Sequence, residues 1–88
     1  MKYEYKRRRV RFKPGDIIHS YYKGIWIVTA VVKRKDAADL VEMRKVATEH
    51  GQPCKPVTSQ CDVGWCRLAL KTTLDYMTAQ GVVIPLAV

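Results

Sequence analysis

The chain has 88 residues, of which 48% are hydrophobic and 27% charged, and its formal net charge is +8. This length makes one small domain that buries about 60 to 65% of its unfolded surface and leaves little room for an enclosed active site. The composition argues against disorder for the residues after position 13. No apolar run reaches the roughly 18 residues of a membrane-spanning helix, so we expect no membrane association.

The positive charge is concentrated at the N-terminus. Residues 1–13 carry seven basic side chains and one acidic side chain, Glu4, which is +6 of the total, while the other nine basic and seven acidic residues nearly balance. Six cations fall within eight positions: Lys6, Arg7, Arg8, Arg9, Arg11 and Lys13. Because crowded like charges repel one another, this basic arm predicts a negatively charged partner.

Aromatic residues accompany the basic arm. In an extended chain, Arg7, Arg9 and Arg11 would project to the same side as Tyr3 and Tyr5. Guanidinium groups that bridge phosphates beside rings that stack on bases are typical of nucleic-acid binding. The alternatives are an acidic protein partner, or a solvated arm or first strand that only keeps the protein soluble.

A turn and a hairpin follow the arm. Pro14-Gly15-Asp16 predicts a turn, and the β-rich runs 17–22 and 25–32 are separated by Lys23-Gly24 at hairpin distance. Both alternating sets of the second run are apolar, which predicts a central strand. We expect Trp26 in the core, one of Tyr21 and Tyr22 exposed, and His19 in a structural role; an exposed stacking platform of both tyrosines with Trp26 is the alternative.

Residues 36–51 fit either a helix or a strand. As a helix, the segment would be capped by Asp36 and ended by Gly51. As a strand, residues 40–47 would return antiparallel to the Trp26 run across a polar tip, with Val41, Met43 and Ala47 on one face. Local propensity favours the helix. The need of the preceding strand for a partner favours the strand, which is our prediction.

Basic residues at that tip extend the charged surface. Lys33, Arg34 and Lys35 follow the predicted strand end and are candidates for the same polyanion, although Asp36 and Asp39 beside them equally suit an ordinary charged turn.

The second half predicts shorter elements. Residues 48–60 suggest a loop with a short edge strand, and residues 61–68 another strand with Trp65 in the core. Thr73 would cap a short helix that Gly81 ends. The apolar tail 82–88 is expected to pack on the body or on a neighbouring subunit.

The sequence lacks the usual patterns of a metal site or a catalytic centre. The potential ligands His50, Cys54, Cys61 and Cys66 lack the C-x2-C spacing of structural zinc sites, and the two later cysteines would point to opposite faces of one strand, so we predict no metal. The acids Asp16, Asp62 and Asp75 are scattered, and no phosphate loop or nucleophile elbow is present. We expect no cofactor and no enzymatic activity. Three cysteines cannot all pair within one chain, which suits a cytoplasmic location.

Part of the sequence also resembles a known type of fold. Residues 12–32, FKPGDIIHSYYKGIWIVTAVV, resemble the opening of SH3-like barrels such as KOW-type and Tudor-like modules, with Gly15, Asp16, Gly24, Trp26 and Val28 at the matching positions. In size the chain is also similar to small phage-encoded proteins. The resemblance implies a binding module that engages nucleic acid, ribosomal or transcription complexes, or peptides.

The sequence therefore predicts a mainly β protein: an SH3-like barrel of about five strands with a short C-terminal helix. Its parts would be the arm 1–13, the barrel with its helix 14–80 and the tail 81–88. The predicted function is binding of DNA or RNA through the basic arm, Tyr3 and Tyr5, and the cations at 33–35. The alternative is an assembly subunit that binds an acidic protein or a neighbouring copy through residues 82–88.

Overall fold

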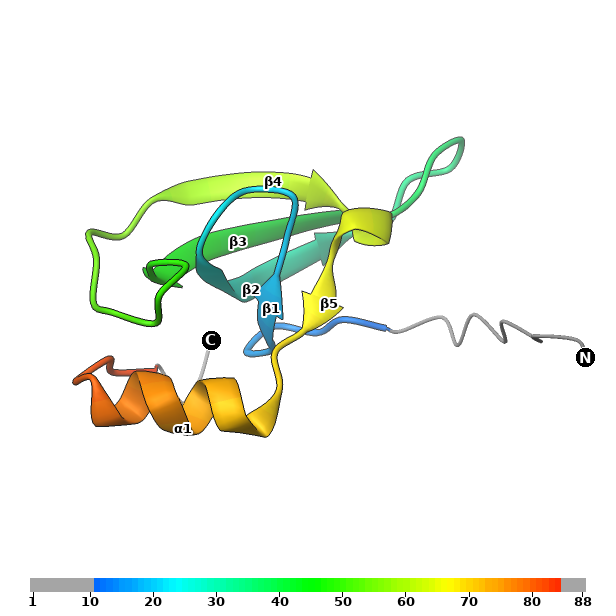
Figure 1. The fold of residues 1–88 in the computed structure, drawn as a ribbon. Coiled ribbons are helices and arrows are strands. Elements are labelled where there is room, and N and C mark those ends of the chain that lie inside the picture. The colour runs from blue at the N-terminus through cyan, green and yellow to red at the C-terminus, as the bar shows by residue number, and fades with distance from the viewer. Residues whose placement is uncertain (1–10, 85–88) are drawn as a thin grey trace, which may run out of the picture.

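Five antiparallel strands form one sheet, and a short helix follows it, in the computed structural model, which describes residues 11–84 (Figure 1). The mainly β fold with a C-terminal helix is thus confirmed. The strand order in the sheet is β4-β3-β2-β1-β5. The elements are β1 (Ile17–His19), β2 (Ile25–Val32), β3 (Leu40–Ala47), β4 (Thr58–Asp62), the 3-10 turn η1 (Val63–Trp65), β5 (Arg67–Leu68) and α1 (Lys71–Ala79).

The central strand β2 is apolar on both faces, as its sequence predicts. Trp26 and Val28 point into one core cluster, whereas Ile25 and Ile27 point into another. The first cluster is completed by Phe12, Ile18, Val41, Met43 and Cys61. The second contains Ile17, Ala47, Met77 and Val82, so it joins the sheet to α1 and to the residues after it. Alternation along a strand that is covered on both sides accounts for this two-sided core.

The segment that fits either a helix or a strand forms strand β3, as predicted. It pairs antiparallel with β2 from the Ile25↔Ala47 pair to the Val32↔Leu40 pair. The register shifts near Ile25, and this irregularity places Ala47 in the second core cluster, away from Val41 and Met43 in the first. The prediction that all three share a face is therefore wrong.

The two predicted turns are present, with one boundary changed. In the first, Gly15 has a φ of 96° and the Lys13 N–H donates to Asp16 Oδ2 at 2.9 Å. Before the second, β1 ends at His19, earlier than the predicted end at residue 22. The Ser20 hydroxyl oxygen accepts a hydrogen bond from the Tyr22 N–H at 3.2 Å, a local side-chain contact that competes with strand pairing at these residues.

The predicted strand 61–68 is interrupted. Cys61 and Asp62 end β4, η1 turns the chain, and Arg67 and Leu68 then pair with β1. Trp65 lies on η1 and is 62% exposed, so its predicted place in the core is wrong. After η1, β5 pairs with β1 at the edge of the sheet opposite β4, and the indole of Trp65 is left exposed.

Helix α1 begins at Lys71 with Leu70 as its N-cap, and the predicted cap Thr73 lies inside it. Its end is as predicted: Gly81 has a φ of 87°, its N–H donates to the Thr78 carbonyl oxygen at 3.1 Å, and the Val82 N–H donates to that of Met77 at 3.0 Å. This is a Schellman motif. Met77 and Val82 are buried, which holds α1 against the sheet below β1 and β2 (Figure 1).

Candidate functional site

The basic arm is anchored to the core at its last aromatic residue. Phe12 is 8% exposed and packs in the first core cluster. Arg11 and Lys13 on either side of it are exposed. The other arm residues proposed for binding lie outside the described residues: Tyr3, Tyr5, Lys6, Arg7, Arg8 and Arg9. The structure thus fixes where the arm joins the domain.

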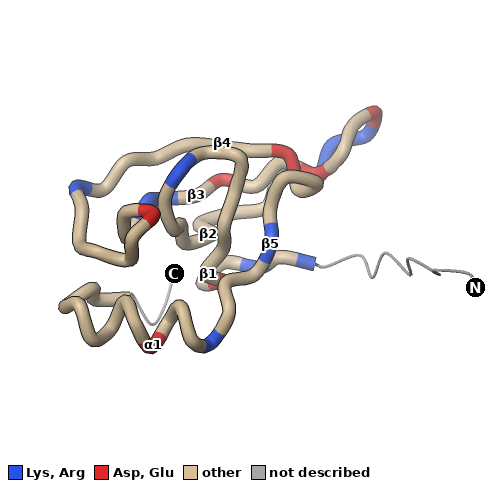
Figure 2. The backbone as a smooth tube through the Cα atoms, in the orientation of Figure 1, with Lys and Arg blue, Asp and Glu red and all other residues tan. Residues whose placement is uncertain are grey.

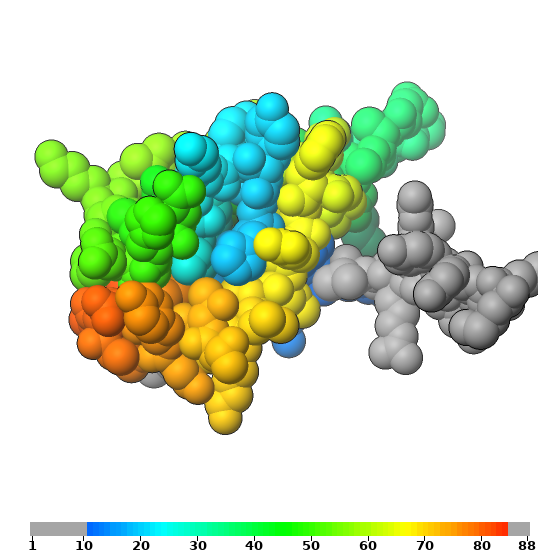
Figure 3. Space-filling view, viewed as in Figure 1, coloured from blue at the N-terminus to red at the C-terminus, as the bar shows by residue number. Residues whose placement is uncertain are grey.

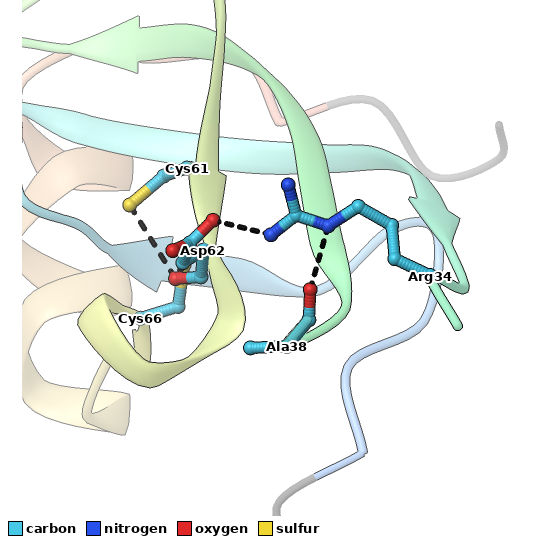
Figure 4. A network of polar contacts seen from close by, with 5 residues as sticks. All are labelled: Arg34, Ala38, Cys61, Asp62 and Cys66. Carbon is cyan, nitrogen blue, oxygen red and sulfur yellow. Dashed lines mark hydrogen bonds and ion pairs between the residues drawn. The ribbon is translucent and has the colours of Figure 1, made fainter. Parts of the chain in front are cut away.

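The loop between β2 and β3 projects from the sheet and carries charges of both signs (Figure 2). Lys33 and Lys35 are exposed in it. Arg34 is engaged within the fold: its Nη2 atom lies 2.6 Å from Asp62 Oδ1, and its Nε–H donates to the Ala38 carbonyl oxygen at 2.7 Å (Figure 4). Arg34 therefore ties the loop to the end of β4, and the two lysines remain as the candidate contacts of this loop.

Three exposed aromatic side chains form a patch, and the prediction that one of Tyr21 and Tyr22 is exposed is wrong because both are. Tyr21 and Tyr22 lie in the β1–β2 turn and are 66% and 46% exposed, and Trp65 on η1 is 62% exposed. The ring centroids of Tyr21 and Trp65 are 5.2 Å apart, and those of Tyr21 and Tyr22 are 5.4 Å apart, both in edge-to-face geometry. We call these three residues the aromatic patch. Figure 3 shows the two segments that carry it side by side, in cyan and yellow.

A hydrogen bond and a strand pairing hold the aromatic patch in place. The Trp26 indole N–H donates to the Tyr22 carbonyl oxygen at 3.3 Å, which ties the turn to the first core cluster. On the other side, the His19↔Arg67 pair between β1 and β5 brings η1 next to the turn. Lys23 and Arg67 are exposed next to these segments. The sequence signal for an outward Trp65 was Gly64, which interrupts the apparent strand.

The cysteines Cys61 and Cys66 lie together where β4 meets η1. Their Sγ atoms are 3.5 and 3.6 Å from the Asp62 carbonyl oxygen, so the prediction that they point to opposite faces of one strand is wrong (Figure 4). Burial, then the Cys61 thiol, and then Asp62 raise the pKa of Cys66 to about 12. Burial and the neighbouring Cys61 thiol therefore disfavour the thiolate of Cys66, which is its nucleophilic form. Within residues 11–84, no three His, Cys, Asp or Glu side chains cluster as a metal site would require.

His19 couples stability to pH. Burial, and secondarily the charge of Arg67, lower its pKa below the ordinary 6.5. Since the folded state disfavours the proton, His19 stabilises the protein above pH 6.5, and this contribution is lost as the pH falls through 6.5 toward the lower folded pKa. We expect the urea midpoint of the wild type to fall between pH 7 and pH 5, and the His19→Gln variant to show a smaller fall. Identical profiles for the wild type and His19→Gln would contradict the assignment to His19.

Comparison with known proteins leaves the family of this chain open. No protein-family model matches it, and neither the curated proteins nor the solved structures contain a significant match. Within the described range, no helix has the length and apolar character needed to cross a membrane. The anchored arm, the charged loop and the aromatic patch are therefore the features from which its function is inferred.

Proposed function

We propose that this protein is a non-enzymatic nucleic-acid-binding module that contacts phosphates through its basic N-terminal segment. The observation that carries the proposal is the anchoring of Phe12 in the core between exposed Arg11 and Lys13. The arm of +6 is thereby attached to a folded body whose remaining charges nearly balance. A polyanion would bind this arm by releasing counterions, which makes affinity depend steeply on salt.

We also propose that the fold is an SH3-like barrel of the KOW or Tudor kind. The support is the resemblance of residues 12–32 together with a five-stranded antiparallel sheet in which β1 lies between β2 and β5. Such an arrangement is compatible with the small barrels that serve as binding modules. A binding role agrees with the exposed aromatic patch, since contiguous apolar surface on a small domain commonly marks an interaction site.

Salt titration tests the proposed function. The triple variant Arg7→Ala, Arg8→Ala, Arg9→Ala should bind a fluorescein-labelled oligothymidylate more weakly than the wild type. Its plot of log affinity against log salt should be flatter by about 2 units, because each of three phosphate contacts on a single strand contributes about 0.7. Fluorescence anisotropy between 50 and 300 mM NaCl measures both quantities.

The control variant removes the same charge from elsewhere on the surface. Arg44, Lys55 and Lys71 are exposed and lie outside the arm, so their joint replacement by alanine should leave most of the slope intact. A slope that does not differ between the arm variant and the wild type, or that falls equally in the control, would rule out the arm as the phosphate contact.

The second candidate is an assembly subunit. Val83 favours it, because this side chain is 85% exposed directly after the buried Val82. An oligomer that persists in 1 M NaCl after nuclease treatment, measured by light scattering, would support assembly. A monomer under those conditions leaves the nucleic-acid proposal as the better account.

A further inference from the structure

The exposure of Trp65 and Tyr21 is unusual for residues of their size. Trp26, the other tryptophan, is 3% exposed, whereas Trp65 is 62% exposed and Tyr21 is 66% exposed. Aromatic side chains supply the largest apolar surface available to a core, so an 88-residue chain that leaves them in solvent forgoes stability. Together with Tyr22 they form one contiguous patch at centroid distances of 5.2 and 5.4 Å. Such a patch indicates a contact surface.

We propose that the aromatic patch stacks on unpaired bases of single-stranded nucleic acid, an inference that rests on the proposed function. Every base has a flat π-face, and aromatic rings beside cations are the usual means of holding a single strand without regard to sequence. The rings of Tyr21 and Trp65 are inclined at 71°, and those of Tyr21 and Tyr22 at 85°. They offer stacking surfaces in different directions, which suits splayed bases and not the continuous stack of a duplex.

The charged residues next to the aromatic patch in the sequence favour a negatively charged ligand. Lys23 follows Tyr22, and Arg67 comes two residues after Trp65; both are exposed, and neither takes part in an ion pair among residues 11–84. Asp62, the acid nearest to Trp65 in the chain, is held by Arg34 at 2.6 Å. The patch therefore has cations free for phosphates, and its neighbouring acid is neutralised.

The patch is also prearranged. The Ser20 hydroxyl oxygen and the Tyr22 carbonyl oxygen each accept a hydrogen bond that fixes the turn, at 3.2 Å and 3.3 Å. Pairing of β5 with β1 fixes the segment that follows Trp65. Because the backbone does not need to rearrange, binding loses little conformational entropy at these positions.

The experiment compares two labelled 12-nucleotide strands with the same number of phosphates, an oligothymidylate and its abasic equivalent, by anisotropy with the full chain. The wild type should bind the strand with bases about tenfold more tightly. The double variant Tyr21→Ala, Trp65→Ala should lose most of this discrimination, and its affinity for the strand with bases should fall close to that of the wild type for the abasic strand. Tyr76→Ala is the matched control: Tyr76 is 51% exposed on α1, and its removal should preserve the discrimination.

Tryptophan fluorescence gives a second measurement that needs no alanine variant. The oligothymidylate should quench the emission of the wild type and the abasic strand should not, whereas Trp65→Phe, which retains only the buried Trp26, should show no quenching.

The outcomes separate the two proposals. Equal, salt-dependent binding of both strands by the wild type would overturn base stacking and leave the phosphate contacts of the arm standing. No binding of either strand would overturn both. If the double variant instead lost affinity for an oligoglutamate of matched charge, the patch would bind peptides, and base stacking would be wrong.

Discussion

Replacing Trp26 by alanine is expected to lower the free energy of unfolding by about 3 to 5 kcal/mol. Trp26 is 3% exposed and packs with Phe12 and Met43 in the first core cluster. Its indole N–H also holds the Tyr22 carbonyl oxygen at 3.3 Å, so the variant loses both a large apolar side chain and a turn contact. A domain of this size is stable by about 5 to 10 kcal/mol in total, so the variant should lose roughly half of its stability.

Trp65 supplies the matched comparison for this prediction. Its side chain is 62% exposed and belongs to neither core cluster, so Trp65→Ala should change the free energy of unfolding by less than about 1 kcal/mol. Urea denaturation followed by circular dichroism measures both variants. Similar losses for the two would show that the indole of Trp65 is part of the core, and the aromatic patch would then not exist as described.

The difference between the two tryptophans shows how far sequence patterns reach. Trp26 belongs to a run that is apolar on both alternating faces. The residues of such a run are expected in the core, regardless of which strands lie next to it. Trp65 stands after Gly64 in a shorter run, and its direction depends on η1. That turn is set by the pairing of β5 with β1, which is a contact between distant parts of the chain.

Residues 40–47 show the same limit in a second way. Their helix-forming composition favours one structure and the unpaired edge of β2 favours another, and the pairing prevailed. The sequence therefore predicted β3 through the requirement of its neighbour. It did not predict the irregularity near Ile25 that puts Ala47 on the other face, because a register shift depends on the detailed fit of two strands.

The candidate site also has features that the sequence predicts and features that only the structure reveals. The cations of the arm and loop are visible in the sequence, since charge needs no partner to be recognised. The ion pair between Arg34 and Asp62, which are 28 positions apart, is not visible there, and neither is the contact between Tyr21 and Trp65. A surface assembled from a turn and a distant 3-10 turn becomes apparent only once the strand order is known.

Gly24 carries the second large stability effect, because its position admits no side chain. Its φ is 108°, in the region that favours glycine, and an added Cβ would lie 3.0 Å from the Ala47 carbonyl oxygen and would collide with the Lys45 side chain. Lysine can move aside, but the carbonyl of a paired strand cannot. Gly24→Ala should therefore lower the free energy of unfolding by about 2 to 4 kcal/mol, the sum of backbone strain and overpacking.

Alanine variants of two other glycines separate backbone strain from overpacking in the same urea experiment. Gly15 has a φ of 96° with nothing within 4 Å of an added Cβ, so Gly15→Ala should show strain alone, about 1 to 2 kcal/mol. Gly64 has neither a positive φ nor a close neighbour, and Gly64→Ala should be within about 0.5 kcal/mol of the wild type. If Gly24→Ala cost no more than Gly15→Ala, the close approach of β3 to the turn would be wrong. The turn that carries Tyr21 and Tyr22 would then lack the support on which the placement of the aromatic patch depends.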